Sequence, residues 1–251
     1  MTQADKARLF ASLHRPGDPV VLFNIWDPGS AKAVAEAGAK ALATGSASVA
    51  AAYGYGDAEQ LPLDLALENA ERVVNKVDLP VTIDFEGGYA VEPERVASNF
   101  TRLAATGAIG CNFEDQVIGG EGLHPVELQA ARIRAAREAA GPEFFLNART
   151  DIFLKAPRHS HDDAMVEEAL ARGRAYAEAG ASGFFVAGLI DLKLLARVCA
   201  ASPLPVNYIA VPGGPSKADV AAAGVARISH GPFPYRRAMA TLKQWAGEAQ
   251  D

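Results

Sequence analysis

The feature that most constrains the fold is a repeated unit in which a helical pattern ends in glycine and leads directly into an apolar run. It occurs as "AEAGAKAL" at 35–42, "AATGAIGC" at 104–111, "AEAGASGF" at 177–184 and "AAAGVARI" at 221–228. Glycine ends helices because it adopts the left-handed conformation without strain. A strand that follows such a helix at once is typical of βαβ units, so we predict a parallel sheet flanked by helices.

Short runs rich in apolar and β-branched residues alternate with helical patterns along the whole chain. The eight runs span residues 20–23, 41–44, 81–85, 111–114, 144–148, 183–186, 206–209 and 227–229. Proline at the start and glycine after the end mark helices at 28–37, 93–106 and 125–140, and a first helix is predicted at 4–14.

Eight strands alternating with helices in 251 residues match the (β/α)8 TIM barrel in number and length. The main alternative is an open, doubly wound sheet, which would carry G-x-G-x-x-G after its first strand. The segment "FNIWDPGSA" does not supply that motif, and no linker separates two halves of the chain. We therefore predict that residues 1–251 form a single α/β barrel domain.

Composition and charge exclude several classes of protein. The net charge is −6 and the 24 Lys and Arg residues are dispersed, so the basic surface of a nucleic-acid-binding protein is missing. The start, "MTQADKARLF", lacks a signal-peptide layout, and no apolar run approaches the roughly 18 residues of a membrane span. We expect a cytoplasmic protein, in which Cys111 and Cys199 are small buried hydrophobic residues.

Polar side chains gather where the predicted strands end, and in barrels of this class functional groups lie at the carboxyl ends of the strands. Side chains alternate in direction along a strand, so residues two apart share a face. Three consecutive strands then aim carboxylates and one guanidinium at a common mouth. The groups that share a face are Asp84 with Glu86, Asn112 with Glu114, and Asn147 with Arg149 and Asp151.

The acidic residues of this mouth suggest a metal site. Clustered carboxylates repel each other and lose hydration, which is costly unless a cation compensates. Asp84, Glu86, Glu114 and Asp57 would form an oxygen-rich cage without His or thiolate, which suits Mg²⁺, with Mn²⁺ as the alternative ion. Glycines 87–88 would let the backbone turn and approach a ligand. The competing interpretation, solvated loop carboxylates, requires the same chance placement at three strand ends.

Arg149, in "FFLNARTD", is the only cation at these strand ends. Its planar fork suits a substrate carboxylate bound through two hydrogen bonds. The alternative is a structural ion pair with Glu114 or Asp151, and the two roles can coexist.

Two further groups of residues are candidates for binding and proton transfer. Thr44, Gly45 and Ser46 offer hydroxyls and backbone N–H groups for an anion, although an ordinary loop is nearly as good an interpretation. His124 and His230 lie near the predicted mouth as candidate proton carriers, against the commoner case of surface histidines.

The motifs, taken in order and spacing, resemble the isocitrate lyase/phosphoenolpyruvate mutase superfamily from about residue 23 to the C-terminus. They are "NIWDPGSA", "ATGSASVAAAYGYGD", "TIDFEGGY", "NFEDQ", "NARTD", "AYAEAGASGFFV" and "GVARISHGP". The resemblance implies a (β/α)8 barrel, often with its last helix swapped between subunits of a tetramer. It also implies a Mg²⁺-dependent site for 2-oxo acids.

Residue roles follow from the resemblance at matching positions. Asp84 would bind the metal directly, with Asp57, Glu86 and Glu114 reaching it largely through water. Arg149 and the segment Thr44, Gly45 and Ser46 would hold the carboxylate and keto groups of the substrate. Asn207 matches a polar position that faces the substrate, and Trp26 and Asp27 match the loop after the first strand.

The chain departs from the family pattern in the loop after the Glu-Asp-Gln strand. Lyases carry Lys-(Lys/Arg)-Cys-Gly there, with the Cys in proton transfer, and mutases carry Lys-x-Asn-Ser. Here residues 117–125 read "VIGGEGLHP", which is shorter and has neither Cys nor Lys. The Glu that lyases place after strand six is also replaced, around 187–188. Isocitrate and 2-methylisocitrate cleavage are therefore disfavoured, and the sequence is most similar to the mutase-like branch.

We expect a Mg²⁺-dependent carbon–carbon lyase, decarboxylase-like, acting on a small 2-oxo dicarboxylic acid. An enolate would be stabilised by the metal and Arg149, and the product protonated by water, Tyr53 or His124. One alternative is a phosphonopyruvate/phosphoenolpyruvate mutase-type isomerase or C–P hydrolase. Another is a catalytically silent 2-oxo acid binding protein. The expected partners are the substrate and copies of the same chain, in a dimer or tetramer, and neither nucleic acid nor membrane.

Overall fold

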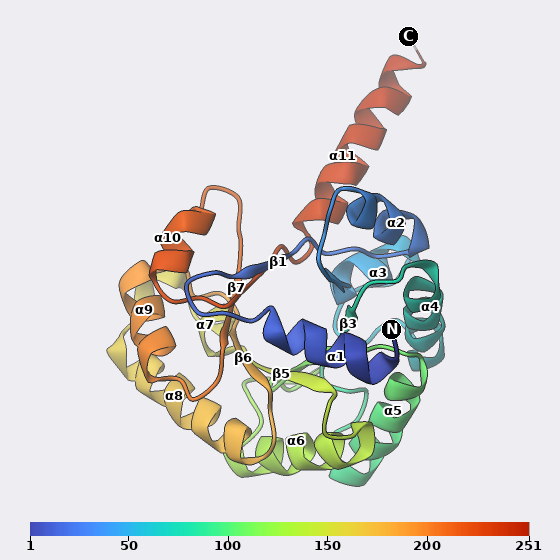
Figure 1. Cartoon of the computed structure of the whole chain (residues 1–251). Coiled ribbons are helices and arrows are strands. Elements are labelled where there is room, and N and C mark those ends of the chain that lie inside the picture. Colours follow the sequence, from blue (N-terminus) through green and yellow to red (C-terminus); the bar gives the residue numbers. More distant parts are fainter. Residues whose placement is uncertain (251) are drawn as a thin grey trace.

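Eight parallel strands form one sheet in the computed structural model, which describes residues 1–250 (Figure 1). The strands are β1 (Val20–Leu22), β2 (Leu42–Ala43), β3 (Val81–Asp84), β4 (Gly110–Glu114), β5 (Phe145–Thr150), β6 (Gly183–Val186), β7 (Val206–Ile209) and β8 (Arg227–Ser229). Each overlaps one predicted run. Their order in the sheet is β1-β8-β7-β6-β5-β4-β3-β2.

The sheet closes on itself between its first and last strands. An isolated parallel bridge joins Ile25, just beyond β1, to Thr44, just beyond β2. Its backbone hydrogen bonds run from Ile25 N to Ala43 O at 2.9 Å and from Gly45 N to Ile25 O at 3.1 Å. The predicted (β/α)8 barrel is therefore confirmed, and the doubly wound alternative is excluded because such a sheet stays open.

Helices accompany the strands, and most of them form a ring around the barrel. They are α1 (Gln3–Ser12), α2 (Pro28–Glu36), α3 (Ser46–Ala52), α4 (Leu63–Lys76), α5 (Pro93–Ala105), α6 (Val126–Ala140), α7 (Ile152–Lys155), α8 (Asp163–Glu178), α9 (Leu192–Ala201), α10 (Lys217–Ala222) and α11 (Phe233–Glu248), with a 3₁₀ turn η1 (Arg158–Ser160). The helices predicted at 28–37, 93–106 and 125–140 are all present. Proline occupies the first turn of α2 and α5, as expected for a residue without an N–H.

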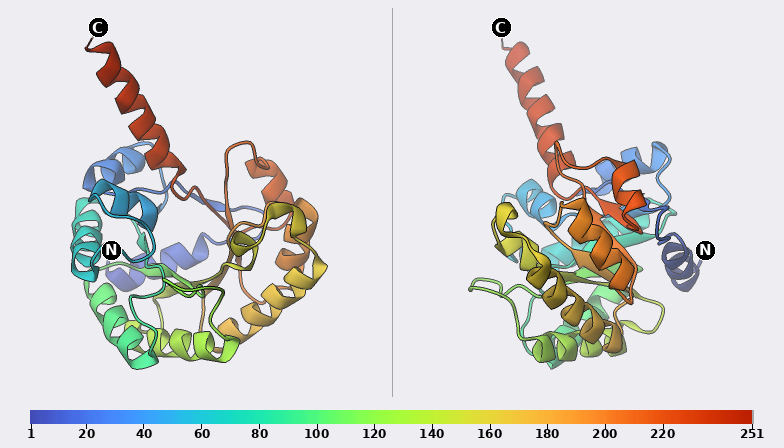
Figure 2. Two further views of the ribbon diagram at one scale, coloured as in Figure 1. Left: turned by 180° about the vertical axis from the view of Figure 1, so that it is seen from behind. Right: turned by 90° about the vertical axis from the view of Figure 1, so that its left-hand side faces the viewer.

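The amino end of the barrel is closed by α1, which lies across it (Figure 2). Phe10 is fully buried and packs edge-on against Phe145 at the start of β5, with 5.1 Å between ring centroids. Ala41 and Ile109, which immediately precede β2 and β4, belong to the same small apolar cluster. The carboxyl ends of the strands are therefore the end at which a ligand can enter.

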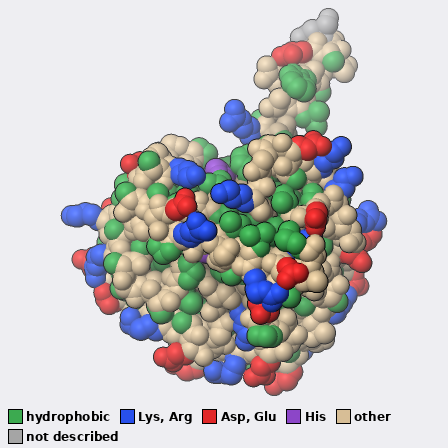
Figure 3. Space-filling model, viewed as in Figure 1, with side chains coloured by type: hydrophobic (Ala, Val, Ile, Leu, Met, Phe, Trp, Pro, Cys, Tyr) green, Lys and Arg blue, Asp and Glu red, His purple; other side chains and the backbone are tan. Residues whose placement is uncertain are grey.

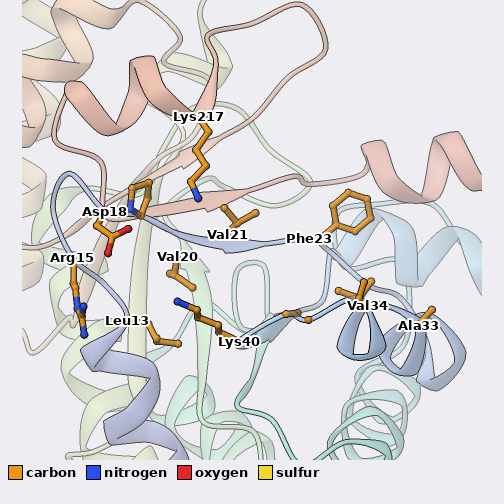
Figure 4. A pocket seen from close by; sticks show the side chains of 14 residues that line it. Leu13, Arg15, Asp18, Val20, Val21, Phe23, Ala33, Val34, Lys40 and Lys217 are labelled. Carbon is orange, nitrogen blue, oxygen red and sulfur yellow. The ribbon is translucent and has the colours of Figure 1, made fainter.

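The last helix does not join the ring. Figures 1 and 3 show α11 extending away from the barrel, and its hydrophobic side chains Met239, Leu242 and Trp245 are exposed. The outer face of β1 is correspondingly uncovered, and a groove of about 610 Å³ lies over it. Figure 4 shows the groove along β1, with Val34 of α2 on one side and Lys217 of α10 on the other.

This geometry agrees with the expected exchange of the last helix between subunits, which stays a prediction because the structure contains one chain. The single-domain assignment of residues 1–251 also stays a prediction.

Within residues 1–250, no helix is both long enough and apolar enough to cross a membrane. Cys111 is fully buried and Cys199 half-buried, and both are free thiols. The interpretation of Cys111 as a buried hydrophobic residue therefore holds.

Candidate active site

A cavity of about 310 Å³ opens at the carboxyl ends of the strands, where the sequence predicts the functional groups. Its apolar wall comes from the loops that follow β5, β6 and β7 and from the start of α11. Its charged lining consists of Asp57, Asp84, Arg149, Arg158 and Arg236. Gly45, Ser46 and Asn112 also line it. We call this cavity the mouth.

Asp84, the last residue of β3, is held by donors on two sides. Its Oδ2 accepts hydrogen bonds from Ser46 N at 3.0 Å and Ser46 Oγ at 2.9 Å, and its Oδ1 accepts one from Asn112 Nδ2 at 3.1 Å. Ser46 begins α3, so the carboxylate also lies at the positive end of a helix. A carboxylate has about four acceptor positions, so these three donors leave Asp84 capacity for a further partner.

Glu86 lies behind Asp84 rather than beside it on the same strand. Its φ is +47°, a left-handed conformation that ends the strand pleat, and its Oε2 accepts a hydrogen bond from Glu59 N at 2.8 Å. Asp84 and Glu86 nevertheless border one small cavity of about 20 Å³, enough for about one water-sized group. Burial, followed by repulsion from Asp84, raises the pKa of Glu86 to about 8.

The two glycines of "EGGY" permit this turn, but they do not bring the backbone close to a ligand, as the sequence predicts. Gly88 has φ +77°, and a Cβ there would lie 2.9 Å from Cε2 of Phe113. A Cβ at Gly87 would lie 3.0 Å from a carboxylate oxygen of Glu59. The close approach is therefore to the protein's own side chains, and neither glycine lines the mouth.

These carboxylates suit a hard divalent cation. Neither His nor Cys lines the mouth, and the carboxylates of Asp57 and Asp84 offer only oxygen ligands. Within residues 1–250, no three His, Cys, Asp or Glu side chains converge closely enough to enclose an ion by themselves. An ion held through Asp84 would therefore keep several water ligands, as Mg²⁺ usually does.

Arg149 forms the ion pairs that were the alternative interpretation of this residue. Its Nη1 lies 2.7 Å from Glu114 Oε2, and its Nε and Nη2 donate to the two oxygens of Asp151 at 2.6 and 2.9 Å. Burial by itself would lower the pKa of Arg149, but the two carboxylates outweigh it and raise that pKa well above its usual range. Since Arg149 has five N–H groups and also lines the mouth, two donors remain for a substrate.

Glu114 is less available to a metal than predicted. It is only 1% exposed and does not line the mouth. One of its oxygens faces Arg149, and the other accepts a hydrogen bond from Gln116 Nε2. Its assignment as a water-mediated metal ligand stays a prediction, whereas its contact with Arg149 is direct.

The sequence-based prediction considered only the strand ends and therefore missed two arginines that line the mouth. Arg158 comes from η1 and Arg236 from α11, and both side chains are exposed. Neither forms an ion pair with any residue in the described part of the chain. The mouth therefore has two cations besides Arg149, which is the one of the three that a strand end supplies.

Several residues predicted to bind the substrate make structural contacts in the fold, and their roles in binding stay predictions. Asp27 caps α2, since its Oδ1 accepts a 2.6 Å hydrogen bond from Ser30 N. Trp26 packs edge-on against Tyr235, with 5.2 Å between ring centroids. Neither lines the mouth. Thr44 lies behind it, where its hydroxyl accepts a 2.9 Å hydrogen bond from Asp84 N.

The candidate proton donors also lie outside the mouth. Tyr53 is 37% exposed at the end of α3, and His230 packs against Phe23 with 5.1 Å between ring centroids. His124, within the loop 117–125, is buried, and burial lowers its pKa. The backbone carbonyl of His124 accepts a hydrogen bond from Arg172 Nη1 at 2.9 Å. The identity of the proton donor therefore stays a prediction, with water as the candidate that needs no side chain.

Asn207 lies inside the barrel, below the mouth, and is 1% exposed. Its Oδ1 accepts a hydrogen bond from Asn147 Nδ2 at 3.0 Å. Asn147 Nδ2 also donates to Asn112 Oδ1 at 2.9 Å, and Arg227 Nη2 donates to the same oxygen at 3.1 Å. This buried polar layer was not predicted, although an arginine inside an otherwise apolar run is a signal for it.

The fold and the mouth together define a (β/α)8 barrel with an acidic, arginine-lined pocket at the carboxyl ends of its strands. A family model described as phosphoenolpyruvate phosphomutase matches residues 10–250, so the chain belongs to this family. The predicted resemblance to the isocitrate lyase/phosphoenolpyruvate mutase superfamily, whose members are lyases and mutases, is confirmed.

Three relatives show how far the similarity extends. A candidate phosphonomutase from Burkholderia cenocepacia J2315 is 51% identical with a TM-score of 0.96, over 98% of this chain and 99% of that chain. An uncharacterised protein of Mycobacterium tuberculosis H37Rv is 34% identical over 226 residues, which are 90% of this chain and 83% of the relative. The solved 2,3-dimethylmalate lyase is 28% identical with a TM-score of 0.85, over 100% and 88% of the two chains.

Proposed function

We propose that the protein is a Mg²⁺-dependent lyase that decarboxylates a small 2-oxo dicarboxylic acid such as oxaloacetate. The observation that carries this proposal is the charged lining of the mouth. One cavity of about 310 Å³ holds Asp57 and Asp84 together with three guanidinium groups. Acidic residues for a divalent ion and arginines for a dianionic ligand are the two requirements of such a substrate.

The metal would be held by Asp84, with Asp57 and Glu86 contributing through water. The spare acceptor capacity of Asp84 and the all-oxygen donor set support Mg²⁺, with Mn²⁺ as the alternative. When bound, the ion would supply positive charge to the keto oxygen of the substrate.

The two ends of the substrate would be bound by different arginines. The two free N–H groups of Arg149 suit the carboxylate next to the keto group, close to Gly45 and Ser46. Arg158 and Arg236 line the same cavity and suit the second, distal carboxylate. This division favours a dicarboxylic acid over a monocarboxylic acid such as pyruvate.

Decarboxylation places few demands on the protein. The bond between the β-carbon and its carboxylate breaks, CO₂ leaves, and the electron pair stays on the remaining 2-oxo acid as an enolate. A proton from water then adds to the β-carbon and gives the 2-oxo monocarboxylic acid. The positive charge of Arg149 would stabilise the enolate oxygen, and no nucleophile or general base is required. The absence of Cys and Lys from the loop 117–125 is therefore tolerable.

The alternative function is a phosphonate mutase or C–P hydrolase. The family description and the 51% identical candidate phosphonomutase favour it, and Arg158 and Arg236 would suit a phosphonate as well as a carboxylate. The missing Lys-x-Asn-Ser loop argues against it. A catalytically silent 2-oxo acid binding protein is the third alternative, supported by the lack of a candidate proton donor at the mouth.

Substrate profiling by NMR distinguishes these functions. The protein is incubated with Mg²⁺ and, separately, oxaloacetate, 2-methylisocitrate, isocitrate and phosphonopyruvate. The isosteric variant Asp84→Asn is the test, and Asp64→Asn, on the exposed face of α4, is the matched control.

Pyruvate and CO₂ from oxaloacetate, above the background with Mg²⁺ alone and lost only in Asp84→Asn, would support the proposal. Phosphorus-containing products would favour the mutase or hydrolase. No turnover, together with saturable binding of a 2-oxo acid, would favour the binding protein.

A further inference from the structure

A layer of buried polar side chains forms the floor of the mouth, where Asn112 and Ser229 line the cavity, and has no role in the function proposed above. It crosses the barrel interior from β4 and β5 to β7 and β8. Its members are Asn112, Asn147, Asn207, Arg227 and Ser229, none more than 5% exposed. Barrels of this class usually fill these positions with branched apolar residues, so a polar layer needs an explanation.

Arg227 is the unusual member because it is a buried cation without an acidic partner. It is 0% exposed, and no carboxylate in the described chain lies within ion-pair distance of it. Its Nε donates to Ser229 Oγ at 3.3 Å, while its Nη1 is buried without a hydrogen-bond partner. Its guanidinium lies 5.9 Å from the ring centroid of Phe10. An unpaired buried charge is costly, and an apolar residue would fill the space more favourably.

The hydrogen bonds of Arg227 have a direction that leads to the candidate metal ligand. A guanidinium can only donate, so Asn112 must present its Oδ1 to Arg227 Nη2, at 3.1 Å. Asn147 Nδ2 donates to the same oxygen at 2.9 Å, which reinforces this orientation. The amide nitrogen of Asn112 is thereby turned toward Asp84, and donates to its Oδ1 at 3.1 Å. Because Arg227 can only donate, it determines which group donates and which accepts in both hydrogen bonds of the relay, from Arg227 to Asn112 and from Asn112 to Asp84.

We propose that Arg227 is a positioning residue for Asp84: it orients Asn112 so that the amide of Asn112 holds the Asp84 carboxylate in the geometry that binds a divalent cation. The proposal rests on the function proposed above only in taking Asp84 as the metal ligand. Residues that orient a metal ligand commonly change metal affinity by about 10- to 100-fold when replaced.

Mn²⁺ binding, followed by the EPR signal of the free ion, tests this without requiring turnover. Arg227→Gln removes the donor-only group and lets Asn112 flip, and Asn112→Leu removes the hydrogen bond to Asp84. Each is expected to raise the Kd for Mn²⁺ about tenfold or more. The double variant Arg227→Gln/Asn112→Leu should bind Mn²⁺ no more weakly than the single variants, because both substitutions interrupt the same relay of hydrogen bonds. Arg227→Lys, which can still donate to Asn112, should lie closer to the wild type.

Thr150→Val is the matched control, since Thr150 is also fully buried but lies outside the relay. Thermal unfolding of every variant separates lost folding from lost metal affinity. If Arg227→Gln does not fold, Arg227→Lys and Asn112→Leu complete the test.

Two negative results have different meanings. If Asp84→Asn lowers Mn²⁺ affinity but Arg227→Gln and Asn112→Leu do not, the positioning role is overturned while the proposed function stands. If Asp84→Asn itself binds Mn²⁺ as the wild type does, the metal site is overturned and the positioning role with it.

Discussion

Two hollows of the molecule, the groove over β1 and the mouth, differ in what surrounds them. The groove over β1 has a volume of about 610 Å³, against about 310 Å³ for the mouth. The groove is mostly apolar, with basic residues and the single acid Asp18, whereas the mouth combines two carboxylates with three guanidinium groups. Size alone would favour the groove as the reactive site, whereas the convergence of opposite charges at the ends of several strands favours the mouth.

Each hollow exists because of the position of one helix. The mouth is the open end because α1 packs Phe10 against the opposite end of the barrel. The groove is open because α11 leaves the ring, so the outer face of β1 has no helix over it (Figure 2). We therefore expect chemistry at the mouth and contact between subunits at the groove.

Arg149→Met should lower both the stability and the turnover of the protein, and its effect should exceed that of substituting Arg158, Arg236 or the exposed residues of α11. It would leave Glu114 and Asp151 buried without their cation, which costs about 3–5 kcal/mol of unfolding free energy when a buried pair loses one partner. Turnover should fall by a factor on the order of a hundred or more, because the group that would stabilise the developing oxyanion is removed. Urea denaturation and initial rates measure the two effects. Unchanged turnover would show that Arg149 is only structural.

Arg158→Ala and Arg236→Ala should each raise KM for oxaloacetate by about tenfold, as expected for one lost charge-assisted hydrogen bond. The effect on kcat should be smaller, because both side chains would bind the carboxylate that leaves as CO₂ and not the oxygen on which the enolate charge develops. Arg174→Ala, an exposed arginine on α8 that does not line the mouth, is the control. Equal KM values for both mouth variants and the control would show that these two arginines do not determine substrate specificity.

Substitutions on α11 test whether the groove over β1 is a contact between subunits. Replacing the exposed Leu242 and Trp245 together by Glu should shift the protein toward the monomer, because the groove over β1 is an apolar surface that this helix of a second copy would cover. Size-exclusion chromatography with light scattering measures the change. Turnover per chain should change less than in the Arg158 variant. A wild-type protein that is monomeric at micromolar concentration would contradict the expected oligomer.

Near neutral pH the smallest effect should come from the titration of His14 at the closed end of the barrel, which lowers stability only in acid. Burial, with the positive charge of Arg227, lowers its pKa to about 3, and its ring stacks on Phe145 at 4.2 Å between centroids. The unfolded chain takes up a proton near pH 6.5 that the folded chain refuses. This contribution to stability is therefore complete above pH 6.5 and declines toward pH 3, by up to about 1.4 kcal/mol per pH unit.

Unfolding of the wild type and His14→Gln at several pH values measures this term, with the exposed His159 replaced by Gln as the control. The difference in unfolding free energy between wild type and His14→Gln should decrease as pH falls below 6.5. A difference that does not vary with pH would contradict the effect of burial on His14.

The barrel could be predicted from local patterns, because a helix that ends in glycine and is followed by a short strand can be recognised from the sequence alone. Strand ends also located Asp84 and Arg149 correctly at the mouth. The roles of Arg158 and Arg236 could not be predicted in this way, because they reach the mouth from a 3₁₀ turn and from the last helix.

Two further residues show the limits of reading strand ends alone. The hydrogen bond from Arg227 to Asn112 joins residues 115 positions apart, and exists only once the barrel has closed. Asp27, in contrast, could have been recognised, since an Asp before Pro-Gly-Ser is an ordinary helix cap.

The central claim is that the mouth, and not the larger groove, is a metal-dependent site for a 2-oxo dicarboxylic acid. The most direct test is the initial rate of CO₂ release from oxaloacetate with Mg²⁺, compared among the wild type, Asp84→Asn at the mouth and Lys217→Met at the groove. We predict that the wild type and Lys217→Met react alike, faster than Mg²⁺ alone, and that Asp84→Asn falls to the rate of Mg²⁺ alone. A wild-type rate no faster than Mg²⁺ alone, or an Asp84→Asn rate equal to the wild type, would contradict the claim.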